Sequence, residues 1–253
     1  SGWTDLGTYM TVLILAGTGE ARSIAQYCAD HNIHAQASLA GVTRQPSRLA
    51  VETRYGGFGG ADGFRAYLKT HKITAIIDAT HPFASHITRR SFEVAQEMNL
   101  PLLRFDRPQW EPKVEDNWII LEDETHAAQH ITPGSTVFLA TGRQSLPKFA
   151  NLAHARLICR QIDPPDAKFP WPNGQFLIGR PPFSIGDEEN LFRRLGVDVL
   201  VVKNAGGTAS RTKLDAARIL GVSVLMIARP APCGTQAVQS LLEVEQWLQE
   251  WQL

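Results

Sequence analysis

The sequence alternates short apolar runs with longer amphipathic segments, and this alternation restricts the fold more than any other feature. The predicted strands are Thr11–Leu15, Ala35–Leu39, Ala75–Asp78, Leu102–Phe105, Thr136–Ala140, Ala155–Cys159, Gln175–Ile178, Val199–Val202 and Val224–Ile227. Helical patterns occur at Ala21–Asp30, Gly63–Thr70, Ser85–Glu97, Ile185–Arg194, Thr212–Leu220 and Ala237–Trp251. Strands that alternate with helices form βαβ units, whose parallel sheets are covered by helices. The sequence therefore predicts an α/β protein with mainly parallel sheets.

A chain of 253 residues is long enough for one large domain or two small ones. The stretch 108–133 contains Trp and Pro residues and interrupts the alternation of strands and helices. We interpret it as a crossing segment between an N-terminal α/β domain at 10–107 and a C-terminal α/β domain at 134–253, which includes the final helix. Residues 1–9 are interpreted as an extension outside the fold.

The bulk composition excludes several classes of partner. Lys and Arg total 25 and so do Asp and Glu, so the formal net charge is zero, and no general attraction to nucleic acid or to an anionic membrane is expected. No apolar run approaches the roughly 20 residues of a membrane span. The scattered Cys28, Cys159 and Cys233 indicate neither a disulfide framework nor a metal site. We expect a cytoplasmic protein that is a monomer or a small homo-oligomer.

The most informative motif is the run Gly17, Thr18, Gly19, Glu20, Ala21 and Arg22, which follows the first strand and opens the first helix. Gly17 permits a tight turn, and Gly19 lets a ligand approach the backbone. The helix N-terminus offers unpaired N–H groups to a pyrophosphate. Arg22 stands where the dinucleotide-binding pattern has its third glycine. The run predicts nucleotide binding, with an ordinary strand-to-helix turn as the alternative.

The second strand indicates which dinucleotide binds. A site that prefers NAD usually carries an acidic residue there, about 20 residues after the first glycine, to hold the ribose 2′-hydroxyl. This chain has no acid in that region and instead has Ser38, Thr43 and Arg44, which suit a 2′-phosphate. The sequence therefore favours NADP(H), unless Arg44 is only a solvated loop charge.

Two further loops are candidates for the same site. Ala79, Thr80 and His81 follow a strand end, where open parallel sheets bind ligands. His81 is either a turn residue or a ligand contact, and it is the candidate proton donor if a side chain donates at all. The glycine cluster Gly56–Gly60 either shapes the adenosine end of the site or is an irregular connection.

Several strands of the C-terminal half end in basic residues. In a parallel sheet these ends share one edge, so Arg143, Arg180 and Lys203, with Arg229 as a fourth candidate, are expected to form a cationic rim that suits a ligand with several carboxylates or phosphates. The Lys203 loop adds three candidate substrate-binding residues, which are Asn204, Gly206 and Gly207. The alternative is that these cations pair with local acids such as Asp187, Glu188 and Asp198.

Taken together, these motifs resemble the precorrin-6A reductase family of cobalamin biosynthesis. The resemblance extends from about Thr11 to the last helix, and its most specific part is Asp78–Ala84. Arg180-Pro181-Pro182-Phe183 departs slightly, because Gly-Pro-Phe is expected there. The other matching runs are Gly17–Arg22, Ser38–Gly41, Gly56–Gly60, Arg107–Trp110, Thr141–Arg143, Lys203–Gly207 and Arg229–Pro230.

The resemblance implies two Rossmann-like α/β domains with a cleft between them, NADPH bound mainly by the N-terminal one, and a carboxylate-rich tetrapyrrole as substrate. It also implies the reaction, in which hydride from NADPH and a proton reduce the C18–C19 double bond of precorrin-6A to give precorrin-6B. On this basis Gly17–Arg22 are expected to bind the pyrophosphate, and the loop of Thr80 and His81 to line the nicotinamide.

Three other functions remain open at this stage. A cobalt-precorrin-6A reductase of the anaerobic pathway would use the same chemistry on a metal-loaded ring. A non-catalytic NADP-binding regulatory module would bind the nucleotide without oxidising it. A transferase that uses S-adenosylmethionine would also carry a glycine-rich turn between a strand and a helix.

Overall fold

The computed structural model describes residues 9–41 and 48–251. They form two compact units, each with its own parallel sheet. One unit consists of Ser1–Arg107 together with Pro230–Leu253, and the other is Pro108–Arg229.

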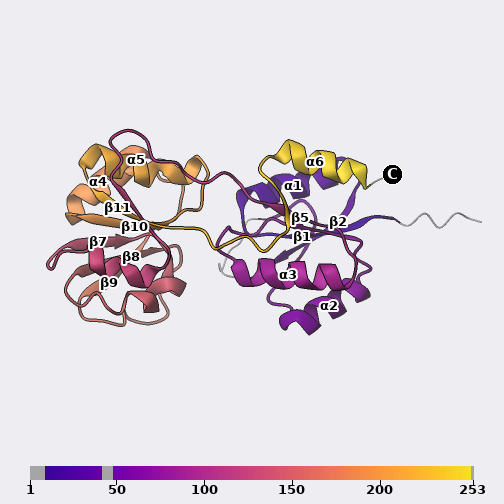
Figure 1. Cartoon of the computed structure of the whole chain (residues 1–253), viewed down its shortest axis with the longest axis horizontal. Helices are drawn as coiled ribbons and strands as arrows, with labels where there is room; N and C mark the ends of the chain where they lie inside the picture. The colour runs from indigo at the N-terminus through magenta and orange to yellow at the C-terminus, as the bar shows by residue number, and fades with distance from the viewer. Residues whose placement is uncertain (1–8, 42–47, 252–253) are drawn as a thin grey trace, which may run out of the picture. The chain divides into compact units, whose positions relative to one another are not determined.

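The first unit is built on a six-stranded sheet in the order β12-β5-β4-β1-β2-β3, in which all strand pairs are parallel. Helices α1 and α6 cover one face, and α2 and α3 cover the other (Figure 1). The strands are β1 (Thr11–Leu15), β2 (His34–Leu39), β3 (Glu52–Tyr55), β4 (Ala75–Asp78), β5 (Leu102–Phe105) and β12 (Gln236–Val238). The helices are α1 (Gly19–Asp30), α2 (Gly60–Thr70), α3 (Ser85–Glu97) and α6 (Leu241–Glu250).

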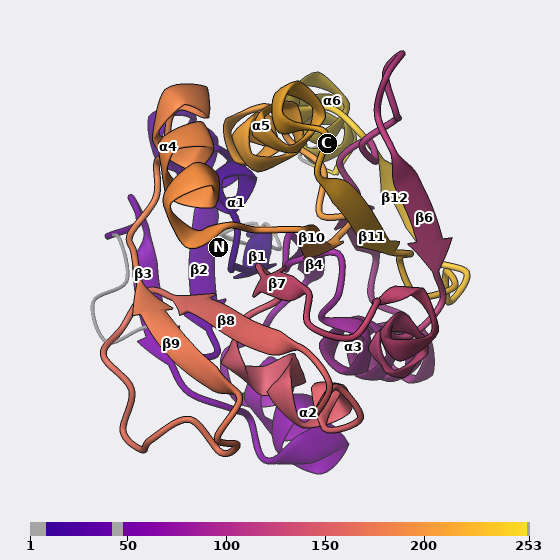
Figure 2. The ribbon, with the colours of Figure 1, turned by 90° about the vertical axis from the view of Figure 1, so that its left-hand side faces the viewer.

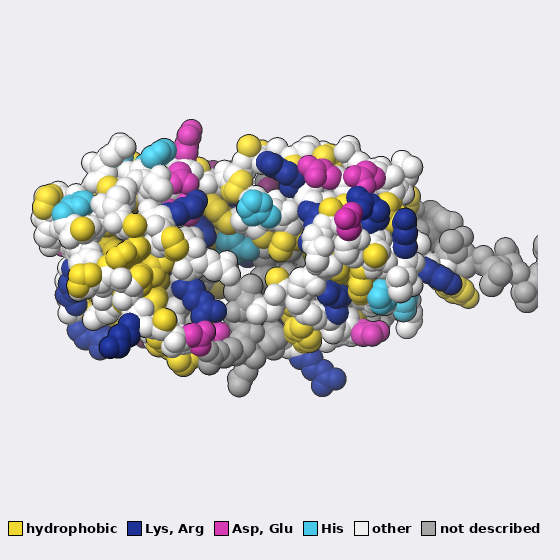
Figure 3. Space-filling view, turned by 90° about the horizontal axis from the view of Figure 1, so that it is seen from below, with side chains coloured by type: hydrophobic (Ala, Val, Ile, Leu, Met, Phe, Trp, Pro, Cys, Tyr) yellow, Lys and Arg dark blue, Asp and Glu magenta, His cyan; other side chains and the backbone are white. Residues whose placement is uncertain are grey.

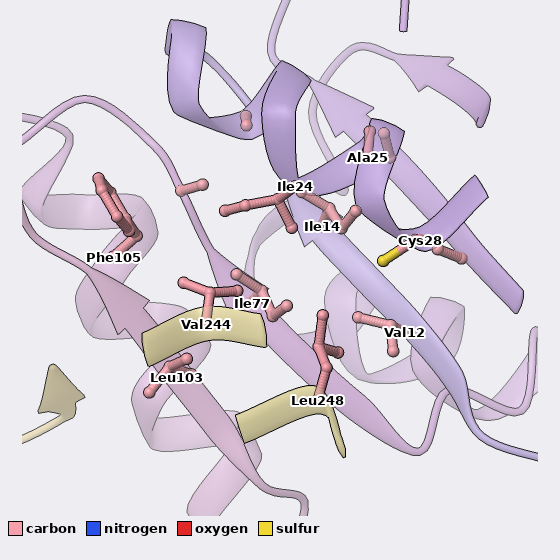
Figure 4. Close-up of a cluster of buried hydrophobic side chains, with 14 of the residues drawn as sticks. Val12, Ile14, Ile24, Ala25, Cys28, Ile77, Leu103, Phe105, Val244 and Leu248 are labelled. Carbon is pink, nitrogen blue, oxygen red and sulfur yellow. The ribbon is translucent and has the colours of Figure 1, made fainter. Parts of the chain in front are cut away.

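The core of this unit follows from the alternation of side chains along its strands. Val12 and Ile14 of β1 point to the α1 side, and Leu13 and Leu15 point to the α2 and α3 side. The final helix closes the first of these layers, since Val244 and Leu248 lie against Ile77 and Leu103 in one buried cluster (Figure 4). Both faces of the central strands are therefore buried, as parallel sheets require.

The second unit repeats this plan with the strand order β6-β11-β10-β7-β8-β9 (Figure 2), and all strand pairs are again parallel. Helices α4 and α5 lie on one face, and the short 3-10 helices η1 and η2 lie on the other. The strands are β6 (Trp118–Leu121), β7 (Thr136–Leu139), β8 (Arg156–Gln161), β9 (Gly174–Ile178), β10 (Val199–Lys203) and β11 (Ser223–Ile227). The helical elements are η1 (Glu124–His130), η2 (Arg143–Phe149), α4 (Ile185–Leu195), η3 (Ala209–Arg211) and α5 (Thr212–Leu220).

The predicted fold class is confirmed, but the units differ from the domains expected at 10–107 and 134–253. The final segment 230–253 belongs to the first unit, because β12 pairs with β5 and α6 packs on its core. The stretch 108–133 is not a crossing segment, because it begins the second unit and supplies its edge strand β6. The first sheet therefore takes its edge strand β12 from a part of the sequence remote from its other strands, whereas the edge strand β6 directly precedes the other strands of the second sheet.

Three general properties of the molecule are its surface charge, its cysteines and the character of its helices. Basic and acidic side chains are interspersed on the face shown in Figure 3. All three cysteines are free, and burial raises the pKa of Cys28 and of Cys159 to about 11. Within the described ranges, no helix is both long and apolar enough to span a bilayer.

Candidate functional site

The first sheet has a topological switch point at its centre. The chain leaves β1 toward β2 on one side and later reaches β4 on the other side, so the loops that follow β1 and β4 diverge from neighbouring strand ends. Such a point, at the carboxyl edge of an open parallel sheet, is where ligands bind. The Gly17–Arg22 run follows β1, and the Ala79–His81 loop follows β4.

The two loops are tied together at the switch point. The Thr18 hydroxyl donates to the carbonyl of Ala79 at 2.8 Å and accepts from the N–H of Ala21 at 3.3 Å, which caps α1. Gly17 has a φ of 152°, and a Cβ there would lie 3.9 Å from the backbone of both Thr80 and His81. The first turn of α1 is thereby fixed against the end of β4.

The space ahead of this helix is open, which is the requirement for a pyrophosphate. A Cβ at Gly19 would meet no other atom within 4 Å. By helix geometry the first N–H groups of α1 have no acceptor inside the helix. The Glu20 carboxylate accepts from Arg107 Nη1 at 3.1 and 3.2 Å, and the Arg22 side chain is exposed. The residues present therefore fit a bound diphosphate.

Asp78 organises the loop after β4, a role that sequence reasoning missed. Its side chain is fully buried, and its Oδ1 accepts from the Thr80 N–H at 3.1 Å and from the Thr80 hydroxyl at 2.6 Å. Its Oδ2 accepts from the Thr88 hydroxyl of α3 at 2.6 Å. Arg104 of β5 donates from Nη1 to Asp78 Oδ1 at 2.9 Å and to the Thr80 carbonyl at 3.0 Å. Charge-assisted bonds thus hold the backbone of Thr80 in place.

His81 lies half-buried in the same loop. Its Nδ1 accepts from the Phe83 N–H at 3.2 Å, so the neutral ring carries its proton on Nε2. The structure therefore places His81, together with Ala79 and Thr80, beside the turn of Gly17, as the spacing of strand ends predicted.

The end of β2 holds a cation that the sequence did not single out. Ser38 is buried, and its hydroxyl accepts from Arg54 Nη1 of the neighbouring strand β3 at 3.0 Å. Arg54 was missed because its strand, Glu52–Tyr55, is short and partly polar and has no apolar run to indicate it. Thr43 and Arg44, the other residues expected there, lie outside the described residues.

The candidate cations of the second unit do follow its strand ends. Arg143 begins η2 after β7 and lies 3.8 Å from Asp166 Oδ2. Arg180 follows β9 and is exposed, and Lys203 ends β10 half-buried. Burial lowers the pKa of the Lys203 ammonium. Because β7 and β10 are neighbours and β9 is at the edge, Arg180 is separated from the other two by β8.

The loop after β10 packs on the start of the second unit. Asn204 accepts from the Trp110 N–H at 2.8 Å and donates to its carbonyl at 3.1 Å, and the Trp110 indole donates to the Gly207 carbonyl at 2.7 Å. A Cβ at Gly206 would lie 2.2 Å from the Pro108 carbonyl oxygen. These contacts give Asn204, Gly206 and Gly207 a role in shaping the loop.

A buried ion pair lies on the α4 side of the second sheet. Arg160 Nη2 of β8 donates to Glu188 Oε2 of α4 at 2.7 Å, with 8% and 1% of the two side chains exposed. The guanidinium also stacks on Phe138 and Phe183, at 5.0 and 4.2 Å from the ring centroids. Near this pair lies Lys213 of α5, whose pKa falls to about 8 because of burial and repulsion from Arg160.

Replacing Lys213 by Met is expected to raise the free energy of unfolding at pH 7 by about 1–3 kcal/mol. In the folded protein the ammonium loses its proton near pH 8, whereas in the unfolded chain it keeps it to about pH 10.4. The destabilisation caused by the buried charge is therefore fully present below about pH 8 and is lost as the pH rises from about 8 to about 10.4. Urea unfolding at pH 7 and at pH 10 measures the difference, and equal effects at both pH values would contradict the prediction.

The fold and the first site define a doubly wound α/β protein with a glycine-rich turn at the topological switch point of its first sheet. The family model described as precorrin-6x reductase CbiJ/CobK matches residues 11–249. A precorrin-6A reductase of Rhodococcus erythropolis is 43% identical over 240 residues, covering 94% of this chain and 96% of the relative. One of Mycobacterium tuberculosis is 40% identical with the same coverage. The solved CobK precorrin-6A reductase matches with a TM-score of 0.90 at 34% identity, covering 95% of this chain and 96% of that one.

The chain therefore belongs to the precorrin-6x reductase CbiJ/CobK family, and it is a reductase. Relatives named cobalt-precorrin-6A reductase are more distant. The one from Priestia megaterium is 26% identical over 231 residues, covering 87% of this chain and 90% of the relative.

Proposed function

We propose that this protein is a precorrin-6A reductase that uses NADPH to reduce the C18–C19 double bond of precorrin-6A, giving precorrin-6B in cobalamin biosynthesis. The observation that carries the proposal is the open space ahead of Gly19, at the switch point of a doubly wound sheet, in a chain of this reductase family. NADPH supplies the hydride when bound, so the protein's own residues have to bind, orient and handle one proton.

The first unit supplies the residues for the cofactor. The run Gly17–Arg22 binds the pyrophosphate through the N–H groups of α1, with Thr18 as the cap and Glu20 neutralised by Arg107. Ala79, Thr80 and His81 line the nicotinamide, held by the Asp78 and Arg104 pair. Ser38, Thr43 and Arg44 are the residues proposed to bind the 2′-phosphate of the adenosine.

The second unit supplies cations for the acidic side chains of the macrocycle. Arg143, Arg180 and Lys203 follow three parallel strand ends, so they lie along one edge of the sheet. Arg groups bind carboxylates through two parallel hydrogen bonds. The loop of Asn204, Gly206 and Gly207 gives this edge its shape and offers backbone groups to the substrate.

The proton that completes the reduction comes either from His81 or from an ordered water. His81 carries its proton on Nε2 when the ring is neutral, and an ordered water is the alternative donor. The two differ in their response to mutation, because a side-chain donor is lost when His81 is replaced and an ordered water is not. Replacing His81 by Ala should therefore lower kcat strongly if the imidazole donates the proton, and only slightly if water does.

The decisive experiment follows NADPH absorbance when the purified protein meets precorrin-6A. We expect oxidation of NADPH and formation of a product with two more hydrogens, and a slower reaction with the cobalt-loaded substrate. In Gly19→Ala the added methyl group occupies the space for the pyrophosphate and meets no other part of the chain within 4 Å, so it should weaken NADPH binding without a steric cost to the free protein. NADPH binding without oxidation would instead favour the regulatory module.

Replacing Arg44 by Ala is expected to raise the KM for NADPH about 10- to 100-fold, because a charge-assisted contact with the 2′-phosphate is lost. The KM for NADH should change little, since NADH has a hydroxyl at that position. Steady-state kinetics with both cofactors measure the two values. An equal rise for both cofactors would remove Arg44 from the 2′-phosphate.

A further inference from the structure

Arg54 uses only three of its five guanidinium N–H donors in hydrogen bonds with the described residues. It donates from Nη1 to the Ser38 hydroxyl at 3.0 Å and to the Gly56 carbonyl at 2.9 Å, and from Nη2 to the Gly57 carbonyl at 3.0 Å. All three acceptors are neutral, and no carboxylate pairs with Arg54 within 9–41 and 48–251. A guanidinium has five N–H donors. The Nε–H and one Nη2–H are therefore left for a ligand, which is enough for one two-pronged contact with a phosphate.

Arg90 of α3 is a second cation whose charge is not balanced. In the described part of the chain it forms no hydrogen bond or ion pair, and its Nε is buried without a partner. The carboxylate that acts on the charge of Arg90 is Asp78. Asp78 already accepts hydrogen bonds from Thr80, Thr88 and Arg104. Burial, together with repulsion from Arg54, lowers the pKa of Arg90.

One aromatic ring brings these two arginines together. The Cζ of Arg54 lies 3.9 Å from the centroid of Phe58, and that of Arg90 lies 5.2 Å from the same centroid. The two Cζ atoms are therefore separated by no more than the sum of these distances. Cation–π contacts compensate such charges only in part, and two like charges this close favour an anion that touches both.

The position of the pair selects the anion. Arg54 is bonded to Ser38 at the carboxyl end of β2, and in doubly wound sheets the residue at that end meets the 2′ position of the adenosine ribose. A phosphate monoester there carries close to two negative charges at neutral pH. A pyrophosphate is bound by the helix N-terminus that follows β1, so it needs no such pair.

We propose that Arg54 and Arg90, which both lie against Phe58, form the anion-binding pair that recognises the 2′-phosphate of NADPH and so makes this chain select NADPH over NADH. The proposal rests on the proposed function and extends it, because it assigns cofactor choice to two strand- and helix-borne residues in addition to Arg44. Ser38 positions Arg54 and directs its free N–H groups toward the ligand.

Calorimetry on the whole protein, with NADP⁺ and NAD⁺ as the titrants, tests the pair. The variants are Arg54→Gln and Arg90→Gln, and the matched control is Arg89→Gln, which removes an exposed neighbouring charge on the same helix. Each test variant should weaken NADP⁺ binding about 10- to 100-fold, as expected when a hydrogen bond to a charged group is lost. NAD⁺ binding, and both affinities of the Arg89 control, should change little.

A second measurement covers any variant that unfolds. The ³¹P resonance of the bound 2′-phosphate, followed against pH, should show a pKa below the ordinary value of about 6 in the wild type. Arg54→Lys and Arg90→Lys keep the charge but lose the planar fork, so they should bind NADP⁺ more weakly than the wild type and more tightly than the Gln variants.

The possible results separate the two proposals. Folded Gln variants that keep the wild-type ratio of NADP⁺ to NAD⁺ affinity, or that lose both affinities equally, overturn the role of the pair and leave the proposed function standing. A wild type that binds NAD⁺ as tightly as NADP⁺ also overturns the pair and contradicts NADPH as the specific cofactor. A wild type that binds neither nucleotide overturns the proposed function, and the pair with it.

Discussion

Replacing Arg160 by Met is expected to lower the free energy of unfolding by about 3–5 kcal/mol, because the variant leaves a buried carboxylate without its partner. Only 1% of the Glu188 side chain is exposed, and its ion-pair partner is Arg160, whose Nη2 lies 2.7 Å from Oε2. The stacking of the guanidinium on Phe138 and Phe183 is lost as well. Urea unfolding of the variant and of the wild type at pH 7 measures the difference.

The double variant Arg160→Met with Glu188→Leu is the matched control. It removes both charges and fills their places with apolar side chains of similar size, so it should regain most of the lost stability or exceed the wild type. A double variant as unstable as the single one would show that packing around Phe138 and Phe183, rather than the orphaned carboxylate, causes the loss.

The second large effect is expected for Asp78→Ala in the first unit. The exposed fraction of the side chain is 7% for Arg104 and 0% for Asp78, so the variant strands a buried guanidinium and costs about 3–5 kcal/mol of unfolding free energy. It also releases Thr80 and Thr88, whose hydroxyls donate to Asp78 at 2.6 Å. Because Thr80 belongs to the loop proposed to line the nicotinamide, NADP⁺ affinity should fall too.

Thermal unfolding and calorimetry with NADP⁺ measure the two losses. The control is Asp62→Ala, which removes a carboxylate that is fully exposed and paired with Arg65 at 2.8 Å. Exposed pairs of this kind contribute little, so the control should match the wild type in both measurements. If Asp78→Ala matched the wild type as well, Asp78 would not be the organiser of the loop.

The fold class was predictable because the central strands are buried on both faces and read as uninterrupted apolar runs. Three edge strands were not predicted. Glu52–Tyr55 and Gln236–Val238 are short and partly polar, and Trp118–Leu121 lies in the stretch that was interpreted as a connection. An edge strand is half-exposed and therefore needs no continuous apolar sequence. Its formation depends more on backbone pairing with the neighbouring strand than on the type of its own side chains.

The candidate site was predictable only where chain order determines position. The ends of β1 and β4 meet in any doubly wound sheet, so the turn at Gly17 and the loop at His81 were placed together correctly. The roles of Arg54, Arg90 and Arg104 depend on side-chain contacts with residues between 16 and 32 positions away. A charged residue inside the apolar run Leu102–Phe105 signalled a buried partner, but the sequence did not identify that partner as Asp78.

The path of the chain through its two sheets has a consequence for biosynthesis. Residues 108–229 form a continuous unit, whereas the unit begun by the first strand needs Gln236–Val238 and Leu241–Glu250 to complete it. During translation the inserted unit can finish folding while the earlier one still lacks the helix that covers Ile77 and Leu103. The half of the molecule that leaves the ribosome first is thus the last to become stable, and until then its apolar layer is the part of the nascent chain that a chaperone would bind.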